Sequence, residues 1–308
     1  MGTSVHFDGP MRACAIPAFL KPGDRLYAIA PSGAIRDPAA FQVGLDEWRS
    51  RGYRVKLAPG WDDRYGYLAG TDDSRRQQLA LALGDPECKG ILCIRGGWGA
   101  ARALENWTPP LDEANPKWLI GFSDITSLLW AWAIKGISGV HGPVLTTWDD
   151  EPDGSKQRLF DWVERGTIAP LVGEGWGGGT ASGLLLPANL TVATHLLGTA
   201  VQPDLDGVVL ALEDVGEAPY RLDRLLTHWR MTGALTQVAG IALGRFSSCE
   251  APEGYPSLSV EDLLRDRLSD LGIPVVSGLA FGHEGENAAL PVGVRVSLNG
   301  DLGRLDFG

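Results

Sequence analysis

The first 145 or so residues of the chain alternate between short apolar runs and segments with helical spacing, and this alternation restricts the possible folds more than any other feature. The helical segments include 38–51, 71–83 and 125–134, and the apolar runs are 25–30, 53–58, 90–94 and 117–121. A repeated strand–helix order is typical of a mostly parallel sheet with helices on both faces. We therefore predict an α/β fold for this part of the chain.

The strand–helix rhythm breaks between about 147 and 182. A polar turn cluster occupies 149–154, and six glycines fall among the eleven residues 173–183. Such a composition is typical of loops. Strand and helix signals return beyond it, with helices expected at 220–231 and 260–271. We expect a parallel-sheet N-terminal α/β domain over 1–150, a linker with a mobile glycine-rich loop over 151–185, and a second α/β domain over 186–308.

Charge and apolar content exclude several classes of protein. The chain has 27 Lys and Arg against 38 Asp and Glu, a net charge of −11, whereas nucleic-acid binding needs a basic face. The most apolar run, 125–134, is about half as long as a membrane span. Residues 1–10 lack the Lys or Arg of an export signal. We expect a cytoplasmic protein without nucleic-acid or membrane partners.

The cysteines and histidines point to neither a disulfide framework nor a metal site. Four cysteines in 308 residues are too few for a disulfide scaffold, and no neighbouring His completes a ligand set. The H-E-x-x-H motif is absent. We expect reduced core cysteines, no metal and no cofactor.

Three segments carry polar residues where a predicted strand ends, the position at which parallel sheets bind ligands. Ser123 and Asp124 lie between an apolar strand and an apolar helix. Glu213 follows a second strand, and His283 lies in a glycine-rich loop after a third. The α/β-hydrolase motif G-x-S-x-G fails, because Ile125 occupies its last glycine. Ser123 or Asp124 could instead only cap the helix.

The same three segments supply a nucleophile, a carboxylate and an imidazole in the order Ser, Glu, His. A serine hydroxyl needs a base within hydrogen-bond reach, and that base needs an orienting partner. The glycine-rich segment 95–99 lacks the ending of a P-loop, but it suits a loop that donates an N–H to an oxyanion. The sequence leaves open whether these groups meet.

Six short motifs in this order resemble one known family, from about Leu20 to Gly293: Arg95-Gly96-Gly97-Trp98-Gly99, Gly121-Phe122-Ser123-Asp124-Ile125-Thr126, His141-Gly142-Pro143, Leu212-Glu213-Asp214, Tyr220-Arg221-Leu222-Asp223-Arg224 and Gly282-His283. They are similar to those of the LD-carboxypeptidases, the serine peptidase family S66, which also includes the microcin C immunity peptidases. The resemblance implies an N-terminal domain related to glutamine amidotransferases, a swivelling C-terminal domain, a site between them, and a homodimer.

The resemblance also implies roles for individual residues. Ser123 would be the nucleophile, His283 the general base and acid, and Glu213 its orienting partner. The backbone N–H groups of Gly97 and Asp124 would form the oxyanion hole.

Members of the family cleave the bond between an L-centre and a terminal D-residue, as in the murein tetrapeptide. The immunity branch instead cleaves the amide between aspartate and a nucleotide-like group. We expect a carboxypeptidase that releases terminal D-alanine from a muropeptide. The alternatives are an immunity-type amidase and a non-catalytic two-domain protein that binds a small ligand.

The substrate-binding residues implied by the resemblance are Arg95, Trp98 and Asn189. Trp98 stands where the family usually has Tyr or Phe. Asn189 stands at a substrate-contacting asparagine, although an N-cap of the following helix fits it equally well. A terminal carboxylate calls for a cation, and Arg95, Arg102 and Arg221 are the candidates.

Overall fold

The computed structural model describes residues 11–308, so the segment 1–10, on which the prediction of no export signal rests, lies outside it. The chain forms two compact units. Of the described residues, the first unit consists of Cys14–Ile168 and Ala288–Val292, and the second consists of Ala169–Asn287, Gly293–Gly308 and residues 11–13. Within residues 11–308, no helix is both long and apolar enough to cross a membrane.

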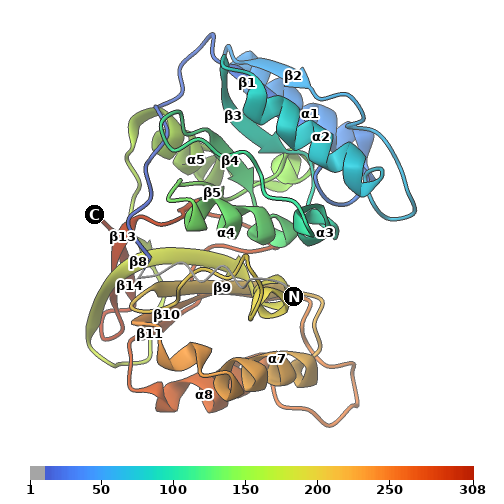
Figure 1. The fold of residues 1–308 in the computed structure, drawn as a ribbon. Helices are drawn as coiled ribbons and strands as arrows, with labels where there is room; N and C mark the ends of the chain where they lie inside the picture. Colours follow the sequence, from blue (N-terminus) through green and yellow to red (C-terminus); the bar gives the residue numbers. More distant parts are fainter. Residues whose placement is uncertain (1–10) are drawn as a thin grey trace. The chain divides into compact units, whose positions relative to one another are not determined.

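The first unit is built on a six-stranded sheet in the order β12-β5-β4-β3-β1-β2 (Figure 1). All neighbouring strands are parallel except β12 and β5. This agrees with the predicted parallel sheet. The strands are β1 (Arg25–Ile29), β2 (Arg54–Leu57), β3 (Cys88–Cys93), β4 (Trp118–Gly121), β5 (Val140–His141) and β12 (Leu290–Pro291).

Three helices of the first unit, at 38–50, 72–84 and 126–134, begin and end close to the predicted positions, whereas the helix at 153–165 lies in the range expected to be a linker. Thr71 caps the second helix by accepting a hydrogen bond from the N–H of Ser74, as its sequence context predicts. The helix after β4 is buried on nearly all sides, which gives the residues before it a rigid support. The helices are α1 (Pro38–Ser50), α2 (Asp72–Gly84), α3 (Ala100–Leu104), α4 (Thr126–Ile134) and α5 (Asp153–Arg165), with short 3₁₀ turns at Ser123–Ile125 and Leu145–Asp150.

The second unit contains an eight-stranded sheet in the order β6-β14-β13-β8-β9-β10-β11-β7. Its centre is parallel and consists of β8 (Thr180–Asn189), β9 (Val209–Val215), β10 (Gly240–Ser247) and β11 (Val275–Ser277). Antiparallel strands extend it on both sides: β6 (Leu171–Val172), β7 (Glu174–Gly175), β13 (Arg295–Asn299) and β14 (Arg304–Phe307). In each sheet taken by itself, the carboxyl ends of the parallel strands lie along the same side of that sheet.

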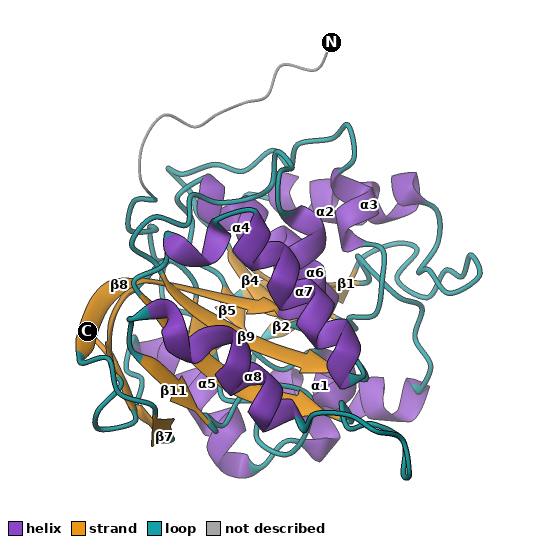
Figure 2. Ribbon diagram, turned by 90° about the horizontal axis from the view of Figure 1, so that it is seen from below, coloured by secondary structure: helices purple, strands orange, loops and turns teal. Residues whose placement is uncertain are grey.

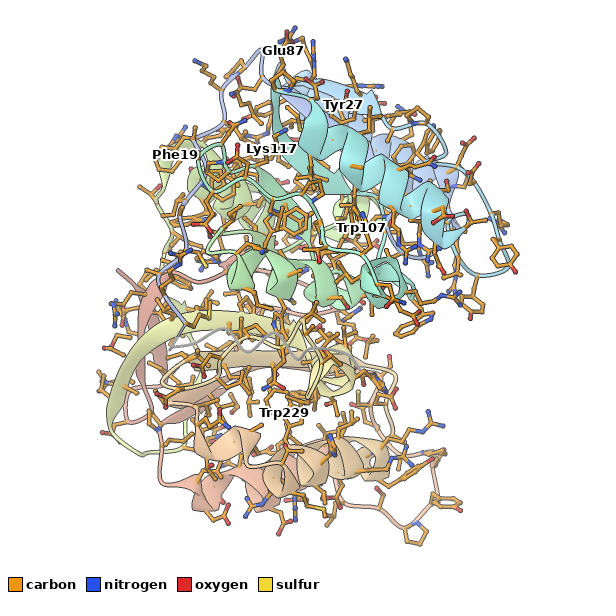
Figure 3. The ribbon with its side chains drawn as sticks, viewed as in Figure 1. Phe19, Tyr27, Glu87, Trp107, Lys117 and Trp229 are labelled. Carbon is orange, nitrogen blue, oxygen red and sulfur yellow. The ribbon has the colours of Figure 1, made fainter. Side chains whose placement is uncertain are left out.

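The helices of the second unit are α6 (Leu190–Leu196), α7 (Pro219–Met231) and α8 (Val260–Leu268), with 3₁₀ turns at Ala234–Thr236 and Ser269–Leu271. Helices α7 and α8 lie side by side against the sheet (Figures 1 and 2). Trp229 of α7 is buried between the helix and the sheet (Figure 3). Its indole N–H donates to Thr194 Oγ1 of α6 at 2.8 Å, which ties the two helices together.

The glycine-rich segment differs from its expected form. Helix α5, strands β6 and β7 and the first part of β8 occupy the range 151–185. A Cβ added to Gly173 would lie 2.1 Å from the carbonyl oxygen of Ser277, and one added to Gly175 would lie 2.0 Å from that of Gly300. These glycines therefore allow close backbone packing at the sheet edge, a role that composition alone does not distinguish from loop freedom.

A buried lysine holds the carboxyl end of α2 in the first unit. Lys117 is 5% exposed, and its ammonium group donates to the backbone oxygens of Ala82, Leu83 and Asp85 at 3.0, 2.6 and 2.6 Å. The last carbonyl groups of a helix lack intrahelical partners, so the lysine satisfies them. Lys117, labelled in Figure 3, directly precedes β4 in the chain and therefore also anchors the strand that leads to Ser123.

Replacing Lys117 by Met is expected to lower the free energy of unfolding by about 2 kcal/mol, because one buried and two partly buried carbonyl groups lose a charged donor. Urea denaturation measures this change. Lys21→Met removes an exposed lysine as the control and is expected to stay within about 0.5 kcal/mol of the parent. Equal stabilities of the two variants would contradict the capping role.

Candidate active site

Ser123 lies in a sharp turn between β4 and α4 and has a left-handed backbone conformation, with φ at +63°. A residue with a side chain pays about 1–3 kcal/mol for this conformation, and such strain is concentrated at functional sites. Phe122 before it is extended, and the 3₁₀ turn begins at Ser123 itself. The chain thus reverses at the serine, which is the geometry of a nucleophile presented at the end of a strand.

The glycine-rich loop after β3 packs against this serine. A Cβ added to Gly96 would lie 3.0 Å from Ser123 Cβ and 3.2 Å from Ser123 Oγ. Gly97 and Gly99 have φ values of +107° and +134°, which favour glycine. Within residues 11–308, no oxygen accepts a hydrogen bond from the N–H of Gly97. This donor is therefore available to a ligand.

The side chain of Asp124 fastens the glycine-rich loop to the turn. It is fully buried and accepts hydrogen bonds from Ser32 Oγ and from the N–H of Ala100, the latter at 2.8 Å. Burial raises the pKa of this carboxyl group, whereas these donors act in the opposite direction. Asp124 thus joins three segments of the first unit and does not cap the helix, since among residues 11–308 no side chain accepts a capping hydrogen bond there.

Arg75 of α2 is a support that sequence reasoning missed. Its guanidinium is fully buried, donates to the backbone oxygen of Gly70 at 2.8 Å and reaches that of Gly99 at 3.4 Å. It therefore holds the far end of the glycine-rich loop. An arginine inside a polar helix pattern resembles a surface residue, so nothing in the sequence indicates this burial.

In the second unit, Glu213 and His283 lie in direct contact. Nδ1 of the histidine is 2.6 Å from Oε2 of the glutamate, whose side chain is fully buried. Burial lowers the pKa of His283, but the charge and hydrogen bond of Glu213 and the charge of Asp214 outweigh this effect and raise it. The predicted proximity of these two residues is thus observed, and the glutamate fixes the orientation of the imidazole.

Asn189 lies beside Glu213 because β8 and β9 are parallel and place the two residues in register. Its Oδ1 accepts the N–H of Val192 at 3.1 Å and thereby caps α6. Its Nδ2 donates to Glu213 Oε1 at 3.2 Å and to Asp214 Oδ1 at 3.1 Å. The capping role considered from the sequence is therefore present, and the contact with substrate stays a prediction.

The loop that carries His283 is held by a residue that the sequence did not indicate. Arg245 of β10 donates to the backbone oxygens of Glu284, at 2.8 Å, and of Glu286. The N–H of Gly282, whose φ is +126°, donates to Asn287 Oδ1 at 3.1 Å. Hydrogen bonds on both sides of His283 thus hold the backbone of the loop that carries it.

The three candidate arginines differ in their partners. Arg102 pairs with Asp72 at 3.0 Å, and Arg221 lies 3.6 Å from Glu217. Arg95 is half-buried and donates only to the backbone oxygen of Ala34, at 3.1 Å, with no carboxylate partner among residues 11–308. Trp98 is 38% exposed in the glycine-rich loop. Arg95 is thus the candidate whose charge is still available to an anion.

The predicted site residues are divided between the two units. Ser123, Asp124 and the glycine-rich loop with Arg95 and Trp98 belong to the first unit, whereas Asn189, Glu213 and His283 belong to the second. His141, which belongs to the third of the six motifs, is fully buried, and its ring meets that of Phe122 edge-on at 5.9 Å.

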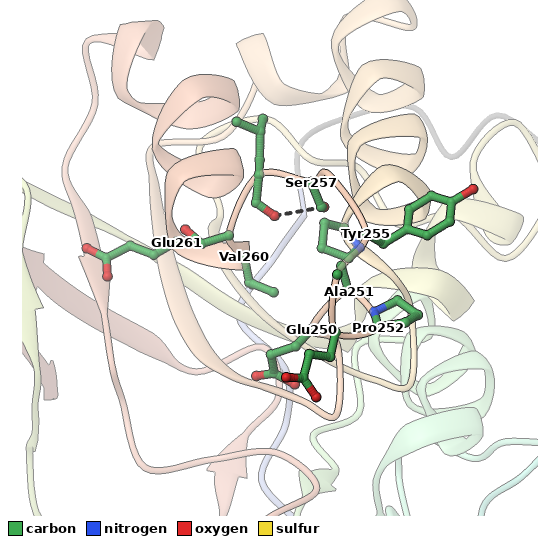
Figure 4. A pocket seen from close by; sticks show the side chains of 12 residues that line it. Glu250, Ala251, Pro252, Tyr255, Ser257, Val260 and Glu261 are labelled. Atoms are coloured by element: carbon green, nitrogen blue, oxygen red, sulfur yellow. Dashed lines mark hydrogen bonds between the residues drawn. The ribbon is translucent and has the colours of Figure 1, made fainter.

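A pocket of about 580 Å³ in the second unit contains none of the predicted site residues (Figure 4). It is formed by the loop before α8 and by Pro219, and the carboxylates of Glu250, Glu253 and Glu261 line it. Ser257 donates to the backbone oxygen of Leu258 at 2.9 Å within this loop. This pocket contains no nucleophile with a base beside it, so the candidate catalytic residues remain Ser123, Glu213 and His283.

The chain belongs to the LD-carboxypeptidase family. The model of the LD-carboxypeptidase N-terminal domain matches residues 27–142, and that of the C-terminal domain matches residues 182–298. Together they cover well over half of the chain and include both groups of site residues. The protein is therefore a carboxypeptidase, and the alternative of a non-catalytic binding protein is not supported.

Relatives along almost the whole chain agree with this assignment. A putative carboxypeptidase of Synechocystis sp. is 57% identical over 94% of this chain and 96% of its own. The murein tetrapeptide carboxypeptidase of Pseudomonas aeruginosa is 31% identical over 90% of this chain and 94% of its own.

Two solved structures have a similar fold. The muramoyltetrapeptide carboxypeptidase from Oxalobacter formigenes gives a TM-score of 0.82 at 29% identity and covers 92% of this chain and 98% of its own. The microcin C7 self immunity protein MccF, in complex with aspartyl sulfamoyl adenosine, gives 0.83 at 20% identity over 95% and 98%. At that identity the second likeness concerns the fold alone.

Replacing Gly96 by Ala is expected to lower kcat about 10-fold or more while the protein stays folded, because the new methyl group would press against Ser123. Steady-state kinetics with circular dichroism measure both. The control is Gly84→Ala at the end of α2, where a Cβ meets nothing within 4 Å. If Gly96→Ala kept the parent's kcat, the close approach of Gly96 to Ser123 would not be needed for activity.

Proposed function

We propose that this protein is a serine LD-carboxypeptidase that releases the terminal D-alanine from murein tetrapeptide during cell-wall recycling. The observation that carries the proposal is the 2.6 Å contact between Glu213 and His283, a buried carboxylate that orients an imidazole. The strained Ser123 turn supports it from the first unit. The substrate follows from the names of the similar Pseudomonas and Oxalobacter proteins.

In the acylation step, Ser123 Oγ attacks the carbonyl carbon of the scissile peptide bond. His283 takes the hydroxyl proton through Nε2, since Nδ1 is engaged by Glu213. The N–H groups of Gly97 and Asp124 donate to the oxyanion of the tetrahedral intermediate. When the intermediate collapses, the C–N bond breaks and His283 returns the proton to the departing amine of D-alanine.

In the deacylation step, water replaces the amine. His283 removes a proton from the water as its oxygen attacks the acyl carbon, and then protonates Ser123 Oγ as the ester bond breaks. The base must be neutral to accept a proton. Because Glu213 and Asp214 raise the pKa of His283, activity is expected to fall as the pH drops through this raised value.

Arg95 is the proposed partner of the terminal carboxylate of the substrate. Its guanidinium lacks an acidic partner among residues 11–308, unlike those of Arg102 and Arg221. A guanidinium can hold a carboxylate with two parallel hydrogen bonds. Trp98 and Asn189 are proposed to contact the substrate as well. The four free cysteines favour a cytoplasmic location, and the family resemblance implies a homodimer.

The Ser123→Ala variant tests the function. We expect it to release D-alanine from murein tetrapeptide at no more than about 10⁻³ of the parent rate, because the attacking oxygen is gone. Mass spectrometry of the product and a thermal melt measure turnover and folding. Turnover at the parent rate in a folded variant would refute the nucleophile.

The same assay separates the two branches of the family. Parent protein is incubated with murein tetrapeptide and with an aspartyl-nucleotide amide. Cleavage of the first with release of the D-residue supports the proposal, whereas cleavage of the second alone would assign the chain to the immunity-type amidases.

Arg95→Gln tests the carboxylate contact. The parent is expected to prefer a peptide with a free terminal carboxylate over its amide, and the variant to lose most of this preference through an increase of KM of about 10-fold or more. Arg102→Gln and Arg221→Gln are matched controls that should keep the preference. An unchanged preference in Arg95→Gln would remove Arg95 from this role.

A further inference from the structure

The buried neighbourhood of Glu213 contains two groups that the proposed mechanism does not use. Asp214 follows Glu213 on β9 and is 2% exposed, and Asn189 at the end of β8 is 4% exposed. Two buried carboxyl groups side by side repel each other when both are charged. A donor between them is therefore required, and Asn189 Nδ2 supplies it to both.

The helix cap fixes which end of the Asn189 amide faces the carboxylates. Its Oδ1 accepts the N–H of Val192 in the first turn of α6. The amide group is planar, so the NH₂ end must point away from the helix, toward Glu213 and Asp214. A capping bond thus sets the direction of a donor to the catalytic pair.

Asp214 is anchored more firmly than a solvated acidic turn would be. Its Oδ2 accepts from the N–H and the hydroxyl of Thr191, both at 2.8 Å, and its Oδ1 accepts from the N–H of Val215 at 2.8 Å. It therefore holds Asn189 in place by accepting the second hydrogen bond of its Nδ2. Burial and the charge of Glu213 raise the pKa of Asp214 to about 6.

We propose that Asn189 and Asp214 are positioning residues that hold the Glu213 carboxylate against His283 and set the proton affinity of the imidazole. Donation by Asn189 to Oε1 leaves Oε2 directed at Nδ1 of the histidine. The proposal deepens the proposed function and rests on it for the catalytic role of His283. It differs from a contact of Asn189 with substrate, because it acts on the free enzyme.

Among residues 11–308, few titratable groups surround this cluster. The charge of Glu213 on the same strand acts on Asp214, the charge of Asp214 acts on Cys249 in the segment after β10, and His283 approaches from the loop after β11. The side chains that face it from β8 and α6 are Asn189 and Thr191, which do not titrate in this range. A change in the proton affinity of His283 therefore reports on this cluster.

Two substitutions should move the pKa of His283 in opposite directions. Asn189→Ser keeps a good capping oxygen but is too short to donate to Glu213, so the partial positive charge of the amide NH₂ group is lost beside the carboxylates and the pKa of His283 rises. Asp214→Asn removes one negative charge near the imidazole, so this pKa falls. Each shift is expected to be about half a pH unit or more.

The experiment is an NMR titration of the His283 ring in the full chain without substrate, with the signal assigned by its loss in His283→Gln. Thr194→Val is the matched control. Thr194 lies on α6, the helix that Asn189 caps, and accepts the indole N–H of Trp229, but its side chain bonds neither Glu213 nor Asp214. We expect a higher pKa in Asn189→Ser, a lower one in Asp214→Asn and no change in Thr194→Val. Thermal melts check that each variant is folded.

An unchanged pKa in a folded Asn189→Ser would overturn the positioning role and leave Asn189 as a cap. The kinetics make a second, independent test: positioning predicts an approximately 10-fold lower kcat with KM within about twofold, whereas a contact with substrate alone predicts a higher KM. Because the titration needs no substrate, a parent protein that fails to release D-alanine would refute the proposed function without deciding the positioning role.

Discussion

The buried carboxylate of Glu213 imposes the constraint on which the arrangement of the second unit depends. A fully buried charge is costly unless hydrogen-bond donors surround it. His283 and Asn189 provide them, one from a loop and one from the neighbouring strand. The parallel register of β8 and β9, the cap of α6 and the Arg245 clamp on the histidine loop all serve to bring donors to this one group.

In the first unit the candidate site consists largely of backbone groups, so the main constraint there is backbone conformation and not a buried charge. Ser123 accepts a strained φ, and Gly96 and Gly99 omit the side chains that would strike Ser123 and Leu68. Strain of this kind persists only where the surroundings enforce it. Here the buried helix α4 and the side chain of Asp124 do so. These contacts hold the N–H group of Gly97 in place. A donor that is already in place needs no reorganisation free energy when an oxyanion forms.

The sequence predicted the fold well because strand and helix periodicity are local properties. The parallel sheet, the Thr71 cap and the position of Ser123 just after β4 follow from patterns within a few residues, whereas Glu213 lies inside β9 and not, as was expected, after it. Long-range packing was not predictable in the same way. The close approach of Gly175 to Gly300 and the clamp from Arg245 to Glu284 join residues far apart in the chain. No local pattern separates such a glycine from a loop glycine, or such an arginine from a solvated one.

The distribution of charge between the two groups of site residues has a consequence for the orientation of substrate. The first unit offers Arg95, without an acidic partner among residues 11–308, and a free N–H at Gly97, both of which attract negative charge. The second unit offers the carboxylates of Glu213 and Asp214, which repel it. In a chain of net charge −11, a substrate carboxylate has few favourable places to bind. This distribution supports the proposed pairing of the terminal carboxylate with Arg95. Such a pairing, rather than the catalytic residues, would distinguish an exopeptidase, because the hydrolytic steps themselves are the same for any acyl group.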